Sequence, residues 1–423
     1  MALTGSNPAL VGGAEQSTRG SRRRIIVIAL LFATYFLTYL DRAVMATAIP
    51  FITKEFQLSS TAAGSVLSAF FFGYALMQIP SGILADRLGP ARLLVVAVIC
   101  WSIFTAMTGL VTSLAMLIVV RILFGLSEGP APAAVSKAIA ISVSRDQIGR
   151  SNGIVLAATL IGGAVAPAFV ATIILHWGWR SAFLGLLVPG LLLALAIRGV
   201  LGGARASTPA ARTEGDTGQA WRAVFGSSQM RWCFAATFFA GAANWGLQNW
   251  LPTYLLKARG FGVAEMGALA SIPFAAGALG YLLGGYAGDR FFAGRRHVLI
   301  LLCLSLSAIA TYGAAVAPGG ILSVAFMTAG FLLIGASMST LFTLPLLLVP
   351  LEATGTAFGI VNTGAQIAGF VSPLLIGAVL DASKQNYAVA LYLVVGLLLA
   401  GAVAASRIRE SRSDLPSGNE VMS

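Results

Sequence analysis

The sequence predicts an all-α membrane protein in which twelve transmembrane helices form two six-helix bundles. Three observations predict this class. First, 57% of the 423 residues are hydrophobic, only 10% are charged and the mean hydropathy is +0.87, which is more apolar surface than the core of a soluble protein can bury. Second, apolar stretches of about 20 residues, the length of a helix that spans a bilayer, recur along the chain. Third, segments of the first half return in the second half.

Polar clusters, or clusters of Pro, Gly and Arg, separate the expected spans. The twelve spans cover residues 26–48, 61–84, 93–112, 114–137, 151–175, 180–201, 231–256, 266–287, 298–317, 321–348, 356–380 and 387–406. The first span follows "RGSRRR", as the apolar part of a signal peptide would. It is over twenty residues long, so we expect a retained helix.

The net charge of +12 is explained by topology. With the N-terminus inside, 20 Lys and Arg residues fall on the cytoplasmic side and five on the opposite side, as the positive-inside rule requires. We therefore expect a multi-pass protein of the inner or plasma membrane with both termini cytoplasmic, and the basic excess requires no nucleic acid as a partner. The three cysteines lie inside apolar spans, so no disulfide framework or metal site is expected.

An internal repeat divides the chain into two halves. The segments "GIVLAATLIGGAVAP" (153–167) and "GIVNTGAQIAGFVSP" (359–373) match at seven of fifteen positions with an offset of 206. Asp86 and Asp289, in the loops after the second and eighth spans, are separated by a similar 203 residues. Parallel repeats of this kind build alternating-access transporters. We predict a tail (1–24), a bundle (25–201), a polar linker (202–229), a second bundle (230–406) and a second tail (407–423). The two tails and the linker are expected to be cytoplasmic.

Several segments carry a family resemblance. They are "YLDRAVMATAIPFI", "SAFFFGYALMQIPSGILADRLG", "RILFGLSEGPAPAAVSKAI", "GWRSAF" and "WLPTYLLKARG". With the span count and the linker, they make the chain resemble the major facilitator superfamily over essentially its whole length, and within it the anion:cation symporter family. The resemblance implies a monomeric secondary transporter, not an enzyme, which takes up an organic anion, above all a sugar acid or related carboxylate, with protons. No cofactor is expected besides the coupling proton.

Four charged residues lie deep inside predicted spans: Asp41 and Arg42 in the first, Arg121 and Glu128 in the fourth. Each charge costs roughly 2.5 to 3.5 kcal/mol at the centre of a membrane, so these side chains should face a cavity and one another. Arg121 and Glu128 are two helical turns apart and share a face, with the small Gly125 between them. A purely structural alternative is two ion pairs that only fasten the first and fourth helices together.

The acids and the arginines suit different tasks. Burial favours a neutral acid and a neighbouring arginine favours a carboxylate, so Asp41 and Glu128 could exchange protons as their surroundings change. The planar fork of arginine suits a substrate carboxylate. The resemblance implies the same division: Asp41 and Glu128 carry coupling protons and Arg42 holds the substrate anion. Arg121 is expected to orient Glu128 or to join the anion site.

Further substrate-binding candidates are uncharged. Tyr39 lies one turn before Arg42, Tyr74 matches a family position that contacts substrate, and buried amides pair at i+4 spacing in the seventh and eleventh spans. These candidates are Tyr39, Tyr74, Gln248, Asn362 and Gln366. Ordinary packing, or hydrogen bonds to a neighbouring helix, would also account for them. The segment "LFTLPLLLVPLEATG" lacks the polar residues of similar sugar-acid carriers, which leaves a smaller or more apolar carboxylate open.

The two repeated loops are the predicted cytoplasmic gate, formed by Asp86, Arg87, Asp289 and Arg290. Their charges can pair with each other, with helix dipoles or with the opposite bundle, while Gly82 and Gly285 permit close helix approach. The alternative is a plain topology signal, because basic loops are expected on this side.

Two other functions remain open after the sequence is read. Proton-antiport efflux of drugs or metabolites uses the same fold, and fold alone does not decide function. A membrane receptor built on a transporter body is the second. The identity of the anion, the proton stoichiometry and the arginine that holds the substrate are not determined by the sequence.

Overall fold

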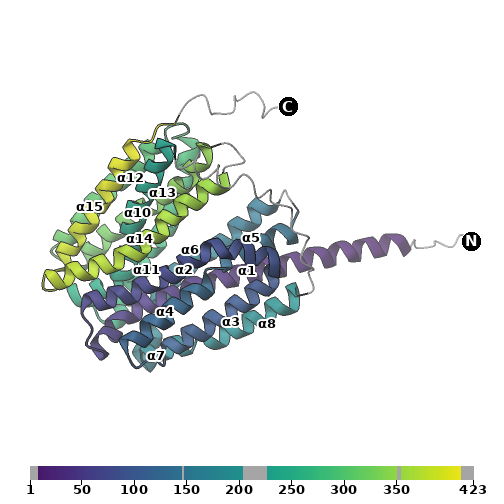
Figure 1. The fold of residues 1–423 in the computed structure, drawn as a ribbon, viewed down its shortest axis with the longest axis horizontal. Coiled ribbons are helices and arrows are strands. Elements are labelled where there is room, and N and C mark those ends of the chain that lie inside the picture. The colour runs from purple at the N-terminus through teal and green to yellow at the C-terminus, as the bar shows by residue number, and fades with distance from the viewer. Residues whose placement is uncertain (1–7, 145–146, 203–225, 350–353, 411–423) are drawn as a thin grey trace, which may run out of the picture.

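The computed structural model describes residues 8–144, 147–202, 226–349 and 354–410, and over these ranges it contains helices and no strands (Figure 1). The first half comprises α1 (Pro8–Glu55), α2 (Ser60–Leu88), α3 (Pro90–Thr108), α4 (Leu114–Glu128), α5 (Ala131–Ser142), α6 (Ile148–Trp177), α7 (Trp179–Leu184) and α8 (Leu187–Leu201). The second comprises α10 (Ser228–Thr253), the π-helical turn η2 (Tyr254–Ala258), α11 (Val263–Arg290), α12 (Arg296–Val316), α13 (Gly320–Leu347), α14 (Thr354–Ala382) and α15 (Tyr387–Ser406).

Each predicted span coincides with helix. Eleven stretches are long and apolar enough to cross a membrane, and the remaining span, 231–256, forms α10. This helix is less apolar because it carries Asn244, Gln248 and Asn249. The fourth span breaks into α4 and α5 at Gly129 and Pro130, where proline cannot continue the hydrogen-bond ladder.

The first helix extends beyond the predicted first span. Helix α1 begins at Pro8, inside the stretch predicted as an N-terminal tail. Most of the predicted linker and most of the predicted C-terminal tail lie outside the described residues.

The helix ends define two sides of the protein. We call the side that holds Arg23, Leu88 and Ser406 the terminal side, and the side that holds Glu55 and Ser60 the far side. Side-chain oxygens cap several helices on the far side: Ser59 accepts from the backbone N–H of Ala62 at 3.1 Å, and Ser113 accepts from that of Met116 at 3.2 Å. Such caps stabilise helix starts because the first N–H groups have no partner within the helix.

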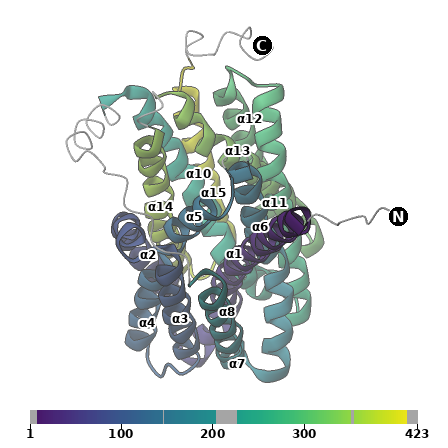
Figure 2. The same ribbon diagram turned by 90° about the vertical axis from the view of Figure 1, so that its right-hand side faces the viewer.

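The two halves meet along two seams, α2 against α14 and α6 against α11 (Figures 1 and 2). Glycines allow this approach. A Cβ atom on Gly64 would overlap the backbone of Pro373, and one on Gly377 would overlap the backbone of Ser60. Small residues are typical of close helix contacts in membranes, so the sequence favours a tight first seam.

Candidate functional site

The four intramembrane charges gather between α1 and α4. Asp41, Arg121 and Glu128 are 2%, 4% and 1% exposed, whereas the side chain of Arg42 is 15% exposed. The arrangement therefore places one accessible guanidinium in front of buried acids.

Arg42 binds Glu128 and three aromatic rings. Its Nε donates to Oε1 of Glu128 at 2.8 Å, and its second terminal nitrogen forms an ion pair with the same oxygen. The guanidinium carbon lies 5.3 Å from the ring centroid of Tyr39, 4.8 Å from that of Phe70 and 4.9 Å from that of Tyr74. These cation–π contacts hold the guanidinium without using up its N–H groups, so N–H groups that Glu128 does not take can serve a ligand.

Arg121 occupies a different environment. Its guanidinium carbon lies 4.8 Å from the ring of Phe124 and 5.3 Å from the ring of Phe70. Its Nε, Oδ1 of Asp41 and Oε2 of Glu128 are buried without a hydrogen-bond partner among the described residues. Glu128 is therefore bound by Arg42 rather than by Arg121, which was expected to orient it. Buried polar atoms without hydrogen bonds are unfavourable, so a proton, a water molecule or a ligand bound to these three atoms would be stabilised.

A glycine on α4 sets the distance to α2. A Cβ atom on Gly125 would overlap the carbonyl oxygen of Phe70, and one on Gly73 would overlap that of Ile122. The small residue between Arg121 and Glu128 thus admits the backbone of α2. As a consequence, the rings of Phe70 and Tyr74 lie over the arginines.

The predicted amides lie on the second half. Gln248 donates to the side-chain oxygen of Asn244 at 2.9 Å on α10, and Gln366 donates to that of Asn362 at 3.4 Å on α14. The described residues show no hydrogen bond from these amides to Arg42 or Arg121. The oxygen of Gln366 is buried and unpartnered, so this side chain retains an acceptor for a ligand.

An aromatic contact joins the two halves near these groups. Trp245, next to Asn244 on α10, packs against Phe71 of α2 with ring centroids 4.9 Å apart. It was absent from the predicted site. The sequence signal for Trp245 is its position between two amide residues of α10, where it adds an aromatic ring to a helix with a polar face.

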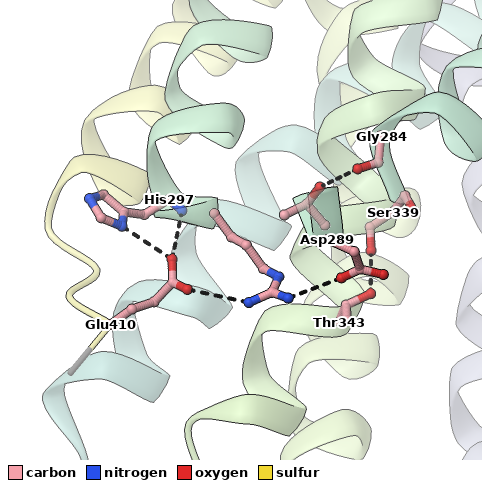
Figure 3. Close-up of polar contacts among 8 residues, drawn as sticks. Gly284, Asp289, His297, Ser339, Thr343 and Glu410 are labelled. Atoms are coloured by element: carbon pink, nitrogen blue, oxygen red, sulfur yellow. Dashed lines mark hydrogen bonds and ion pairs between the residues drawn. The ribbon is translucent and has the colours of Figure 1, made fainter. Parts of the chain in front are cut away.

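The two aspartates of the predicted gate pair within their own halves. Asp86 accepts from Lys137 of α5 at 2.7 Å. Asp289 binds Arg296 at 3.0 Å, and that arginine lies 3.6 Å from Glu410, which also accepts from the backbone of His297 (Figure 3). Arg87 and Arg290 are exposed, and the described residues offer them no hydrogen bond or ion pair. A side chain at Gly82 would meet nothing within 4 Å, so the helix approach expected there is absent in this conformation.

The hydrogen bonds that do cross between the described halves lie on the far side. Asp381, at the end of α14, accepts from the backbone N–H of Ser60 at 2.9 Å and from that of Thr61 at 2.7 Å. The hydroxyl of Thr61 adds a third bond at 2.7 Å. On the second seam, the hydroxyl of Ser271 accepts from the backbone N–H of Ala168 at 3.3 Å. In this conformation the far side is closed by polar contacts between the halves.

Asp381 was missed at the sequence level. An acid in the last turn of a helix is unfavourable beside the negative end of the helix dipole, so its presence there signals a partner. The "SST" at residues 59–61 is a typical helix start with free N–H groups, and these groups are the partner.

Comparisons with known proteins show what the chain is similar to. The family model of the Major Facilitator Superfamily matches residues 31–373 and again 260–420. A probable sulfoacetate transporter of Cupriavidus necator is 30% identical over 409 residues, covering 90% of this chain and 93% of that protein. The hexuronate transporter of Bacillus subtilis is 27% identical over 418 residues, covering 95% and 98%.

Solved structures share the fold at lower identity. A bacterial homologue of the human lysosomal transporter Spinster superposes with a TM-score of 0.80 at 20% identity, covering 94% of this chain and 99% of that chain. The D-xylose-proton symporter superposes with a TM-score of 0.78 at 15% identity, covering 93% and 99%.

Proposed function

The chain belongs to the major facilitator superfamily, and from that premise we propose that it is a secondary transporter which takes up a small organic acid together with protons. Relatives that align over nearly the whole chain are named for sulfoacetate and for hexuronate. Both substrates are small acids that are anionic at neutral pH. The proposed substrate is a sugar acid or a related small carboxylate.

The observation that carries this proposal is the contact between Arg42 and Glu128. A substrate carboxylate that approaches the accessible side of Arg42 competes with Glu128 for the same N–H groups. Glu128 is almost fully buried, so a carboxylate that loses its arginine becomes an unpaired buried charge and is stabilised by taking a proton. Substrate binding and proton uptake are thereby linked through one guanidinium.

Asp41 supplies a second protonatable group. It is as buried as Glu128, and one of its oxygens lacks a hydrogen-bond partner among the described residues. Burial favours the neutral acid and the neighbouring arginines favour the carboxylate, so Asp41 can exchange a proton. We assign Asp41 to proton coupling. We assign Arg121, whose Nε is also unpartnered, to offsetting the negative charge of the two acids.

The second half contributes the other wall of the proposed substrate site. Gln248, Asn362 and Gln366 offer amide groups that can bind hydroxyl or carboxylate oxygens. Alternating access would then proceed by rocking of the halves. The far-side bonds of Asp381 break as that side opens, and the charged loops on the terminal side rearrange. The side of Asp86 and Asp289 is the cytoplasmic side in the predicted topology.

The test is transport in proteoliposomes that contain a pH-sensitive dye. Sulfoacetate, galacturonate, galactonate and glucarate are added outside, with cationic drugs as contrast. We expect one acid class to acidify the lumen in the wild type, and both Asp41→Asn and Glu128→Gln to abolish that acidification. Glu265→Gln is the control, because Glu265 caps the far-side start of α11 and its amide can still accept the bond.

A different outcome identifies the alternative. Proton release on addition of a cationic drug, with no response to any acid, would show an efflux antiporter and refute the proposed function. Acid transport without lumen acidification would refute the proton coupling alone.

A further inference from the structure

A separate cavity of about 520 Å³ opens on the far side of the second half. Its walls come from the π-helical turn η2, the loop that follows it, the end of α12 and the turn before α15. The polar side chains of this wall are Tyr254, Lys257, Arg259, Gln385, Asn386 and Tyr387. The described wall thus carries two cations and no acid. Single π-helical turns within α-helices are frequent at functional sites.

The two cations of this cavity differ in their partners. Arg259 donates from Nε to the hydroxyl of Tyr254 at 2.7 Å, and its terminal nitrogens donate to the carbonyls of Ala317 at 2.9 Å and Ala314 at 2.6 Å. All three acceptors are neutral, so the guanidinium is fixed in place while its charge is not cancelled. Lys257 is exposed and has no hydrogen bond or ion pair among the described residues. Its ammonium is available to a ligand.

A hydroxyl in the same wall also lacks a partner. The Oη atom of Tyr387 is buried without a hydrogen bond among the described residues, and its ring lies 6.1 Å from that of Tyr254. Leaving such a buried group without a hydrogen bond is unfavourable. A side-chain rotation that brings this hydroxyl to a ligand oxygen would recover part of that cost.

The cavity is connected to the closure of the far side. Gln385 lies in its wall, and the Nε2 of that residue donates to Oγ of Ser60 at 2.8 Å and to Oδ1 of Asp381 at 3.2 Å. Ser60 belongs to the first half and Asp381 to the second. A ligand in the cavity would therefore touch a residue that bonds both halves while the far side is closed.

We propose that this cavity is a second binding site, distinct from Arg42, which holds a small organic carboxylate on the far side against Lys257 and Arg259. It is a capture site at the entrance used for uptake. The choice of a carboxylate as ligand rests on the proposed function, whereas the selectivity for an anion follows from the two cations of the wall.

The test is protection of Lys257 from a membrane-impermeant amine-acetylating reagent, read by peptide mass spectrometry on the full-length protein in nanodiscs. Lys54 and Lys384 are matched internal controls, because both are exposed and both lie on the far side. Sulfoacetate and galacturonate are the probes, with sodium chloride at equal ionic strength and neutral galactose as comparisons. We expect at least one acid to slow acetylation of Lys257 several-fold and to leave Lys54 and Lys384 unchanged. Equal slowing of all three lysines, or no slowing of Lys257, would overturn the proposal.

Two variants separate this site from the central one. Tyr387→Phe keeps the ring and removes the hydroxyl, so protection of Lys257 should require several-fold more acid. Arg42→Lys should leave protection of Lys257 intact, and loss of protection in that variant would overturn a separate site. Protection of Lys257 combined with no transport of any acid would refute the proposed function while leaving this site standing.

Discussion

Replacing Arg42 by lysine tests the central site most directly. The substitution keeps a positive charge but removes the fork that delivers two nitrogens to one oxygen of Glu128. The same geometry is available to a substrate carboxylate that takes the place of Glu128. A hydrogen bond to a charged group contributes about 1.5 to 3 kcal/mol, and 1.4 kcal/mol is tenfold in affinity. Loss of one such bond should therefore raise the KM for the organic acid roughly 10- to 100-fold.

The rings around Arg42 decide how the change divides between affinity and stability. An ammonium can still lie against Tyr39, Phe70 and Tyr74, because cation–π attraction does not need a planar cation. Folding should therefore be nearly unaffected, and the effect should fall on substrate binding. Arg42→Met, which removes the charge, should instead leave Glu128 as an unpaired buried acid and lower the thermal stability as well.

The assay is initial uptake of a radiolabelled acid across a range of concentrations, with melting of the purified protein followed in parallel. Arg150→Lys is the control, because Arg150 is exposed on the terminal side and away from the site. An unchanged KM in Arg42→Lys would remove Arg42 from the substrate site. The Glu128 contact would then be a structural fastening between α1 and α4.

Three further predictions concern Gly125, Asp381 and Asp86. Gly125→Ala should lower the free energy of unfolding by about 1 to 3 kcal/mol through overpacking and weaken transport, because α2 must move away from α4. Gly153→Ala is the control and should be neutral, because a Cβ atom there would meet nothing within 4 Å. Equal melting temperatures of the two variants would contradict the role of Gly125 in the packing of α2 against α4. Asp381→Asn should open the far side. A cysteine that replaces the buried Ser68 should then react faster with an impermeant maleimide. An unchanged labelling rate would refute closure of the far side by Asp381. Asp86→Asn breaks a partly exposed ion pair and should cost under about 1 kcal/mol of stability, so a large drop in melting temperature would show that Asp86 has a further partner.

The fold was largely predictable because the membrane restricts the possible structures. A chain in lipid must satisfy its backbone within helices, so span length and composition locate the helices directly. Helix α10 was recognisable despite Asn244 and Gln248, because the stretch around them is still apolar over the length of a span. The position of Pro8 within α1 was not predictable, because nothing apolar marks a helix that continues beyond the membrane segment.

The pairing of side chains was harder to predict, because it depends on how helices pack rather than on spacing along one helix. Arg121 and Glu128 share a face of α4, and this suggested that they would interact. Helix α1 instead presents Arg42 to Glu128, and the Gly125 contact brings α2 with its rings against Arg121. The far-side bonds of Asp381 join residues 320 positions apart, a separation over which a single sequence gives no register.

The net charge of the central cluster gives a physical reason for the proposed proton coupling. With both acids ionised, Asp41 and Glu128 balance Arg42 and Arg121. A substrate carboxylate alone leaves the cluster with a net charge of minus one, and a proton alone leaves it with plus one. An uncompensated charge at mid-membrane costs roughly 2.5 to 3.5 kcal/mol, which makes either singly loaded carrier about 100-fold rarer in a conformation that buries the site. For a substrate with one negative charge, only the empty carrier and the carrier with both ligands are neutral. In the proposed mechanism these two states reorient, which would tie substrate movement to proton movement.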